Sequence, residues 1–202
     1  MLAIIDHGAG NLRSVANAIA RLGYQAMVTS DPAEVLDATA IILPGVGNAA
    51  DTMRHLTESG MAAAIRRLVA EGRPLFAVCV GMQILFSETA EGGRHKCLGV
   101  IPGTVRKLPP GLKTPHMGWN QVKQKMVHHI FDGIPDEANF YFVHSYYADL
   151  EDSSVAAGTT EYGISFCSVL IRGNLVATQF HPEKSGDCGL RMYANFLRRM
   201  KQ

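Results

Sequence analysis

The most informative segment of the sequence is Leu75-Phe76-Ala77-Val78-Cys79-Val80-Gly81-Met82-Gln83, in which an apolar run leads into a cysteine. Residues 75–78 are typical of a strand buried on both faces, and a helix is predicted over residues 81–88. Small residues, Ala77 and Gly81, flank Cys79 two positions away on each side. This pattern is typical of a nucleophile elbow, where the next backbone N–H faces a developing oxyanion. Cysteine in an apolar run is also commonly a small buried hydrophobe, so this window alone leaves both interpretations open.

Before this stretch, short apolar runs alternate with helical patterns. Strands are predicted over residues 2–6, 25–29 and 40–43, with helices over residues 12–22 and 61–71. Asp31-Pro32 is typical of a helix N-cap followed by proline at the first helical position. Continuous apolar strands separated by helices favour a parallel sheet that is covered on both faces.

The second half of the chain is richer in strands. They are predicted over residues 100–108, 139–143, 155–158, 163–171 and 175–180, and Gly173-Asn174 predicts a hairpin between the last two. An amphipathic helix is predicted over residues 188–201. We therefore expect residues 1–202 to form a single α/β domain, a three-layer sandwich with a central mixed, mostly parallel sheet.

Composition and charge exclude several classes of function. Hydrophobic residues make up 47% of the 202 residues, and the formal net charge is +1, so no global field recruits nucleic acid or an anionic membrane. No apolar run approaches the roughly 20 residues of a membrane span, and the first residues lack the basic start of a signal peptide. The four cysteines form no C-x-x-C pair. We therefore expect a reduced, cytoplasmic protein with no bound metal or cofactor.

The glycine turn after the first strand is a weak signal. Gly8-Ala9-Gly10 begins like a dinucleotide-binding loop, but Arg13 stands where that fingerprint needs glycine. A tight turn into a helix is therefore favoured over nucleotide binding.

A thiolate nucleophile needs a base, and His181 is the strongest of eight candidate histidines. It follows a predicted strand, and Glu183, two residues on, can fix its tautomer as the third member of a triad. His-Pro-Glu is also a common loop tripeptide, so a structural role stays open. The weaker candidates are His7, His116 and His144. The histidines in polar surroundings, expected at the surface, are His55, His95, His128 and His129.

Taken together, two windows resemble the catalytic triad of class I glutamine amidotransferases: residues 79–83 and Gln179-Phe180-His181-Pro182-Glu183. Within that class, the windows at residues 8–14, 44–47, 115–120, 141–146 and 181–186 resemble the glutaminase subunits of imidazole glycerol phosphate synthases. The resemblance spans nearly the whole chain and implies a flavodoxin-like three-layer fold. Ala77 replaces the glycine usual in the family's elbow, and His7 replaces a frequent tyrosine. We expect these changes to leave activity intact and to alter only local packing and contacts.

The resemblance implies that Cys79 attacks the side-chain amide of glutamine, with His181 as base and Glu183 as orienting carboxylate. It implies that glutamine and the oxyanion are bound by Gly45, Val46, Gly47, Val80, Gln83, Glu91, His144, Ser145 and Tyr146. The ammonia is implied to pass to a (β/α)₈-barrel cyclase subunit, in a heterodimer that serves histidine biosynthesis. The residues implied at that interface, for which core or rim packing is the alternative, are Asn11, Trp119, Tyr141 and Lys184.

Three other interpretations stay open. One is the glutaminase subunit of pyridoxal phosphate synthase, against which residues 81–83 and 115–120 argue. Another is a stand-alone cysteine hydrolase of γ-glutamyl compounds, which needs no partner. The last is a non-catalytic glutamine sensor, against which the intact Cys79, His181 and Glu183 argue.

Overall fold

The computed structural model describes residues 1–8 and 11–198. Ala9 and Gly10 of the predicted glycine turn, and residues 199–201 of the predicted last helix, lie outside the described residues. The elements in chain order are β1 (Leu2–Ile5), α1 (Leu12–Arg21), β2 (Ala26–Thr29), α2 (Pro32–Asp37), β3 (Ala40–Leu43), α3 (Ala49–Glu58), α4 (Met61–Ala70), β4 (Leu75–Val78), α5 (Val80–Gln83), β5 (Phe86–Thr89), β6 (His95–Lys96), β7 (Ile101–Lys107), β8 (His116–Gln124), η1 (His129–Phe131), β9 (Ala138–His144), β10 (Tyr146–Leu150), η2 (Ser153–Val155), β11 (Ala156–Glu161), β12 (Ser165–Arg172), β13 (Leu175–Thr178), η3 (Pro182–Lys184) and α6 (Gly186–Arg198).

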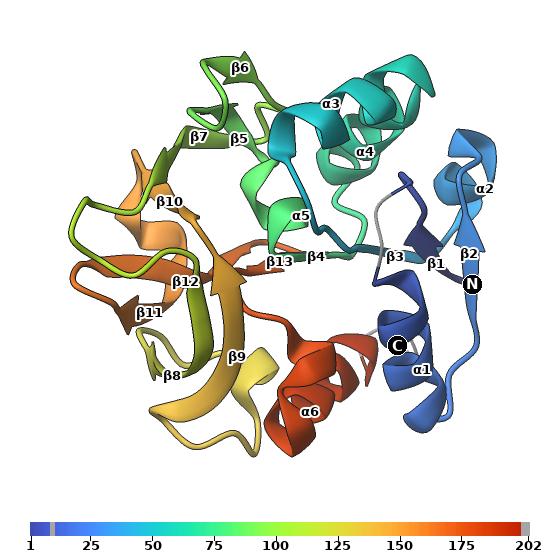
Figure 1. Cartoon of the computed structure of the whole chain (residues 1–202). Coiled ribbons are helices and arrows are strands. Elements are labelled where there is room, and N and C mark those ends of the chain that lie inside the picture. Colours follow the sequence, from blue (N-terminus) through green and yellow to red (C-terminus); the bar gives the residue numbers. More distant parts are fainter. Residues whose placement is uncertain (9–10, 199–202) are drawn as a thin grey trace.

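A nine-stranded sheet, ordered β2-β1-β3-β4-β13-β12-β11-β8-β9, forms the middle layer. Its strands are parallel from β2 to β13 and antiparallel from β13 to β9. Figure 1 shows α2, α3 and α4 covering one face of the parallel half, and α1 and α6 covering the other. Every residue of β1, β3, β4 and β13 is buried, which explains their continuous apolar sequences. The predicted three-layer α/β fold is confirmed.

The parallel strands bring distant segments to one edge of the sheet. The carboxyl ends of β1, β3, β4 and β13 lie side by side there, because these strands are parallel neighbours. The segments that follow them begin with Asp6, Pro44, Cys79 and Gln179. In open α/β sheets such an edge is the usual place for a site.

The helix predicted over residues 81–88 is wrong in its second half. Helix α5 ends at Gln83, and Phe86–Thr89 is strand β5 in a second sheet of order β10-β7-β5-β6. Phe86 and Thr89 are buried while Ser87 is exposed, which suits a strand paired with β7. Helix α3 and strands β6, β8 and β10 were not predicted. The Asn48 side chain caps α3 by accepting from the N–H groups of its second and third residues.

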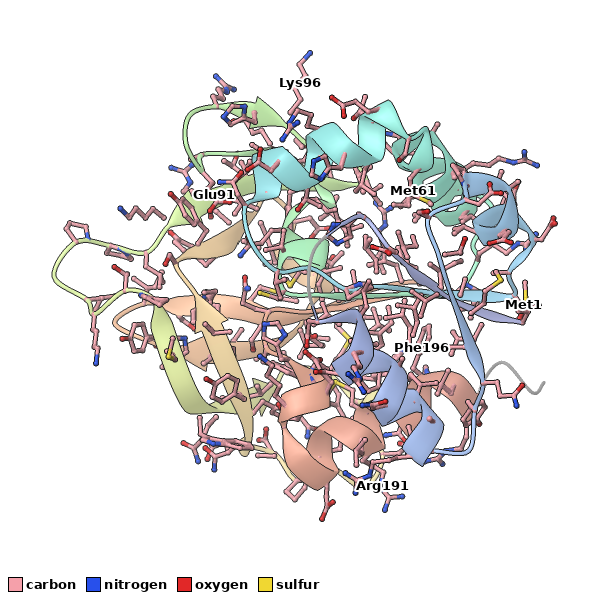
Figure 2. The ribbon with its side chains drawn as sticks, turned by 45° about the vertical axis from the view of Figure 1, so that its right-hand side comes forward. Met1, Met61, Glu91, Lys96, Arg191 and Phe196 are labelled. Carbon is pink, nitrogen blue, oxygen red and sulfur yellow. The ribbon has the colours of Figure 1, made fainter. Side chains whose placement is uncertain are left out.

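Aromatic side chains join the layer formed by α1 and α6 to the sheet. The ring of Phe76 on β4 lies 5.0 Å from that of Tyr193 and 5.3 Å from that of Phe196, centroid to centroid. Figure 2 shows Phe196 inside this layer and Lys96 pointing away from the molecule. These contacts fix α6 against the strand that carries Cys79. Among the described residues, no helix has the length and apolarity to cross a membrane.

Candidate active site

Cys79 sits on a strained turn between β4 and α5. Its φ of 53° and ψ of −110° are unusual for a residue with a side chain, and its N–H donates to the Thr178 carbonyl at 2.7 Å. A Cβ placed on Gly81 would lie 2.2 Å from the Leu43 carbonyl oxygen, and one on Gly45 would lie 2.2 Å from the Gly81 nitrogen. The loop after β3 therefore lies directly against the cysteine turn, and glycine at both positions permits this approach.

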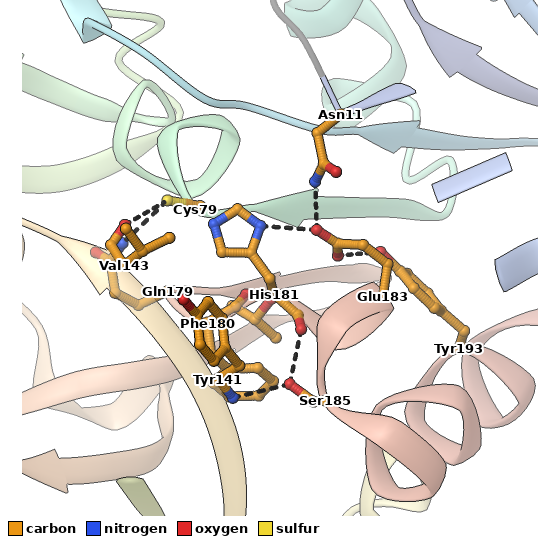
Figure 3. A network of polar contacts seen from close by, with 11 residues as sticks. Asn11, Cys79, Tyr141, Val143, Gln179, Phe180, His181, Glu183, Ser185 and Tyr193 are labelled. Atoms are coloured by element: carbon orange, nitrogen blue, oxygen red, sulfur yellow. Dashed lines mark hydrogen bonds and ion pairs between the residues drawn. The ribbon is translucent and has the colours of Figure 1, made fainter. Parts of the chain in front are cut away.

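His181 is oriented between Cys79 and Glu183. Its Nδ1–H donates to Glu183 Oε1 at 2.7 Å, while its Nε2 is buried with no hydrogen-bond partner among the described residues. Figure 3 shows the ring lying between the sulfur and the carboxylate. Burial lowers the pKa of His181, but interactions with Cys79 and then with Glu183 outweigh it and raise that pKa to about 10. The site therefore favours a protonated imidazole beside the sulfur.

The Glu183 carboxylate is held by three donors. Besides His181, it accepts from the side-chain amide of Asn11 and from the Tyr193 hydroxyl, the latter at 3.3 Å. Burial alone would raise the pKa of Glu183. Its hydrogen bond to His181 and the positive charge of that imidazole outweigh burial, so the pKa lies below its ordinary value. Burial also raises the pKa of Tyr193 well above its ordinary value, so its hydroxyl stays a donor. The carboxylate is thus ionised and fixed.

The backbone of His181 is tied to strand β9. Its N–H donates to the Tyr141 carbonyl at 2.9 Å. The Ser185 hydroxyl donates to the His181 carbonyl at 2.7 Å and accepts from the Tyr141 N–H at 2.9 Å. Two segments far apart in the chain therefore fix the position of the imidazole (Figure 3).

A cavity of about 360 Å³ opens in front of Cys79 and His181. Among the residues predicted to bind glutamine, those that line it are Val46, Gly47, Val80, Gln83, Glu91, His144, Ser145 and Tyr146. Gly45 packs behind the cavity, against the cysteine turn. Pro115 and Val143 also line it and were not predicted. Glu91 accepts from the N–H of Ala49 at 2.7 Å, beside the start of α3 (Figure 2).

Buried amides connect the cavity wall to the sulfur. The Gln83 amide nitrogen donates to the Tyr146 carbonyl at 2.9 Å and to Gln179 Oε1 at 3.1 Å. Gln179 in turn donates to Cys79 Sγ at 3.7 Å, and the thiol lies 3.9 Å from the Val143 carbonyl. Sequence reasoning missed Gln179, although a glutamine directly after an apolar strand is an unusual residue to bury.

The residues expected at a partner interface divide into two groups. Trp119, with 58% of its surface exposed, packs edge-to-face on Tyr141 with ring centroids 6.1 Å apart. Lys184 Nζ lies 5.9 Å from the centre of the Tyr141 ring. Met117, 62% exposed, stands on the same face of β8 as Trp119. Asn11 instead contacts Glu183, so its side chain lies beside the candidate triad.

The other histidines have separate surroundings. His7 Nε2 lies 2.8 Å from the Pro44 carbonyl, and His116 Nδ1 lies 2.9 Å from His144 Nε2. His55 and His95 are exposed, as expected, whereas His128 and His129 are half-buried. Among the described residues, no group of three or more His, Cys, Asp or Glu side chains is placed to hold a metal ion.

The comparisons with known proteins first define the class. The family described as "Glutamine amidotransferase class-I" matches residues 3–200, so the chain belongs to the class I glutamine amidotransferases. A solved structure described as "Crystal structure of glutamine amidotransferase" shares the fold, with a TM-score of 0.77 over 99% of both chains at 22% identity.

Within that class the chain belongs to the HisH family. "Imidazole glycerol phosphate synthase subunit HisH" of Dehalococcoides mccartyi is 58% identical over 198 residues, which cover 98% of this chain and 97% of the relative. The protein of the same description from Moorella thermoacetica is 51% identical over 96% of this chain and 93% of the relative. These findings confirm the resemblance seen in the sequence.

Proposed function

We propose that this chain is the subunit that hydrolyses glutamine to glutamate and ammonia for imidazole glycerol phosphate synthesis, in histidine biosynthesis. The observation that carries the proposal is that Cys79 and His181 lie together at the wall of a cavity sized for an amino acid, with Glu183 hydrogen-bonded to the far nitrogen of the His181 ring. The relationship to the HisH subunits supports the substrate and the pathway.

In the first half of the reaction, Cys79 Sγ attacks the side-chain amide carbon of glutamine, and the carbon–nitrogen bond then breaks. His181 Nε2 holds the proton taken from the thiol and gives it to the departing amide nitrogen, which leaves as ammonia while a thioester remains on the sulfur. The unpartnered Nε2 beside the sulfur suits this transfer, because Nδ1 is already committed to Glu183.

In the second half, His181 activates a water molecule that releases glutamate and restores the thiol. Glu183 keeps the ring in the required tautomer and stabilises its positive charge. The Val80 N–H donates to the oxyanion in both halves, and the peptide between Val46 and Gly47 supplies a second donor. The left-handed φ of Gly47, 92°, and the open space around its Cα allow that peptide to turn.

Ammonia released into water at neutral pH is protonated and lost, so a synthase needs a protected path to a second site. We assign the receiving partner as a (β/α)₈-barrel cyclase, in a heterodimer located in the cytoplasm. The exposed Trp119 beside Tyr141 and Lys184 supports a docking face, because exposed aromatic residues are enriched in the energetic centres of interfaces.

Labelling with a chloromethyl ketone analogue of glutamine tests the proposal. We expect alkylation of Cys79 and protection by glutamine, measured by peptide mass spectrometry. The half-buried Cys188 is the internal control, whereas burial raises the pKa of both Cys97 and Cys167 to about 12 and makes them unreactive. Labelling of Cys188 in preference to Cys79, or labelling of Cys79 that glutamine does not slow, would contradict the proposal.

A further inference from the structure

A line of hydrogen bonds, centred on the buried pair His116 and His144, runs from strand β8 to the wall of the glutamine cavity. The Asn120 amide nitrogen lies 3.2 Å from His116 Nε2, and His116 Nδ1 lies 2.9 Å from His144 Nε2. His144 Nδ1 lies 2.9 Å from the Tyr146 carbonyl oxygen, which also accepts from Gln83. The two histidines therefore join the strand to the segment 144–146 that lines the cavity.

The donor and acceptor groups at the two ends of this line fix the direction of every hydrogen bond in it. A carbonyl oxygen only accepts, so His144 Nδ1 carries the hydrogen and its Nε2 accepts from His116 Nδ1–H. His116 Nε2 must then accept from the Asn120 amide. That amide is itself oriented, because its oxygen accepts from the Gln121 N–H at 2.8 Å and its nitrogen donates to the Glu161 carbonyl at 2.9 Å. The arrangement requires both imidazoles to be neutral.

The surroundings keep both histidines neutral and still. The ring of His116 stacks on Tyr162 and Phe142, with centroids 4.0 and 4.9 Å away. Burial lowers the pKa of His116 to about 4. Burial lowers the pKa of His144 to about 3, with a further contribution from the neighbouring His116 and His181 and an opposing one from the Tyr146 carbonyl.

We propose that His116 and His144 form a neutral relay that fixes the backbone of residues 144–146, and that His116 is a positioning residue for glutamine binding. The inference rests on the proposed function and on the prediction that residues 144–146 bind glutamine. His116 acts through His144, because His144 lines the cavity while His116 lies behind it on β8. Loss of the relay leaves a buried acceptor on His144 without its donor and frees the segment to shift.

The experiment compares variants at residue 116 by their glutamine kinetics in the complex with the partner subunit. His116→Phe keeps the stacked ring and removes the donor, so we expect KM for glutamine to rise about 10-fold while kcat falls less than about 3-fold. The rate at which iodoacetamide alkylates Cys79 should stay within about 2-fold, since that small reagent does not use the segment. Tyr162→Phe is the matched control: it loses only a hydroxyl that donates to the Lys113 carbonyl and should leave KM unchanged.

A second pair of variants guards against a folding defect. His116→Asn and His116→Leu introduce side chains with the same branching and the same number of heavy atoms, and only asparagine retains a donor near the position of Nδ1. We expect a lower KM for glutamine in His116→Asn than in His116→Leu. Equal KM values for this pair, or a wild-type KM in a folded His116→Phe variant, would overturn the relay. Failure of the wild-type complex to hydrolyse glutamine would instead overturn the proposed function.

Discussion

The close approach of the loop after β3 to the cysteine turn predicts the effect of Gly45→Ala. The added Cβ would meet the Gly81 nitrogen at 2.2 Å and Val80 backbone carbon at 2.8 Å, and ordinary contacts begin at 3.4 Å. The loop must therefore retreat by about 1.2 Å, because the opposing atoms are backbone. Overpacking of this kind costs about 1–3 kcal/mol of stability.

The same displacement reaches the proposed oxyanion site. Val46 and Gly47 follow Gly45 directly, and a donor misplaced by about 1 Å loses most of its effect on the transition state. Since one oxyanion donor contributes about 10²–10³ in rate, we expect Gly45→Ala to lower glutaminase kcat about 100-fold with a smaller change in KM. The loss of kcat is measured as the rate of glutamate release by the complex at saturating glutamine.

The matched control is Gly23→Ala, at the opposite end of α1 from Asn11. Gly23 has a φ of 79°, and an added Cβ would meet nothing within 4 Å. The variant should lose about 1 kcal/mol from backbone strain and keep full turnover. Wild-type turnover in Gly45→Ala, or an equal loss in Gly23→Ala, would show that the contact between this loop and the cysteine turn does not position the oxyanion donor.

Three further predictions concern the triad, the partner and pH. His181→Ala should abolish glutaminase turnover, whereas Glu183→Gln should cost less because Glu183 orients the ring; equal losses in steady-state kinetics would contradict this role. The isolated subunit should be nearly idle, and its turnover should rise by orders of magnitude with the partner and its ligand at little change in glutamine affinity; full turnover alone would favour a stand-alone hydrolase. The pKa values of His144 and His116 are about 3 and 4 in the folded protein and about 6.5 in the unfolded chain. As the pH drops below about 6.5, only the unfolded chain gains protons at these histidines. The free energy of unfolding should therefore decrease by up to about 1.4 kcal/mol per pH unit for each histidine. Urea unfolding from pH 7 to 5 measures this fall, which should be smaller in His116→Phe.

Local pattern was sufficient to predict the parallel half of the sheet. Strands β3 and β4 have the predicted bounds, because each is a continuous apolar run between turn residues. The error over residues 81–88 arose because Phe86–Thr89 is a strand only through pairing with β7, which follows later in the chain. Strand β8 likewise depends on β9, since its sequence mixes glycine, asparagine and glutamine.

The candidate site could likewise be predicted from local sequence only in part. Residue types and flanking sequence identified Cys79, His181 and Glu183 as candidates, and the structure places them together; their catalytic roles stay predictions. The contact of Asn11 with Glu183 joins residues 172 positions apart, and no local pattern indicates it. The relay from His116 to His144 was equally hidden, because it depends on the pairing of β8 with β9.

The role of Cys79 as nucleophile is tested by measuring two activities on one preparation of the complex with Cys79→Ala. In the proposed mechanism Cys79 acts only before ammonia is transferred, so glutamine hydrolysis should disappear while product formation from added ammonium salt at raised pH persists. Cys79→Ser, which retains a weaker nucleophile of similar size, should behave in the same way. Glutaminase activity that survives in Cys79→Ala would remove Cys79 from its role as the nucleophile.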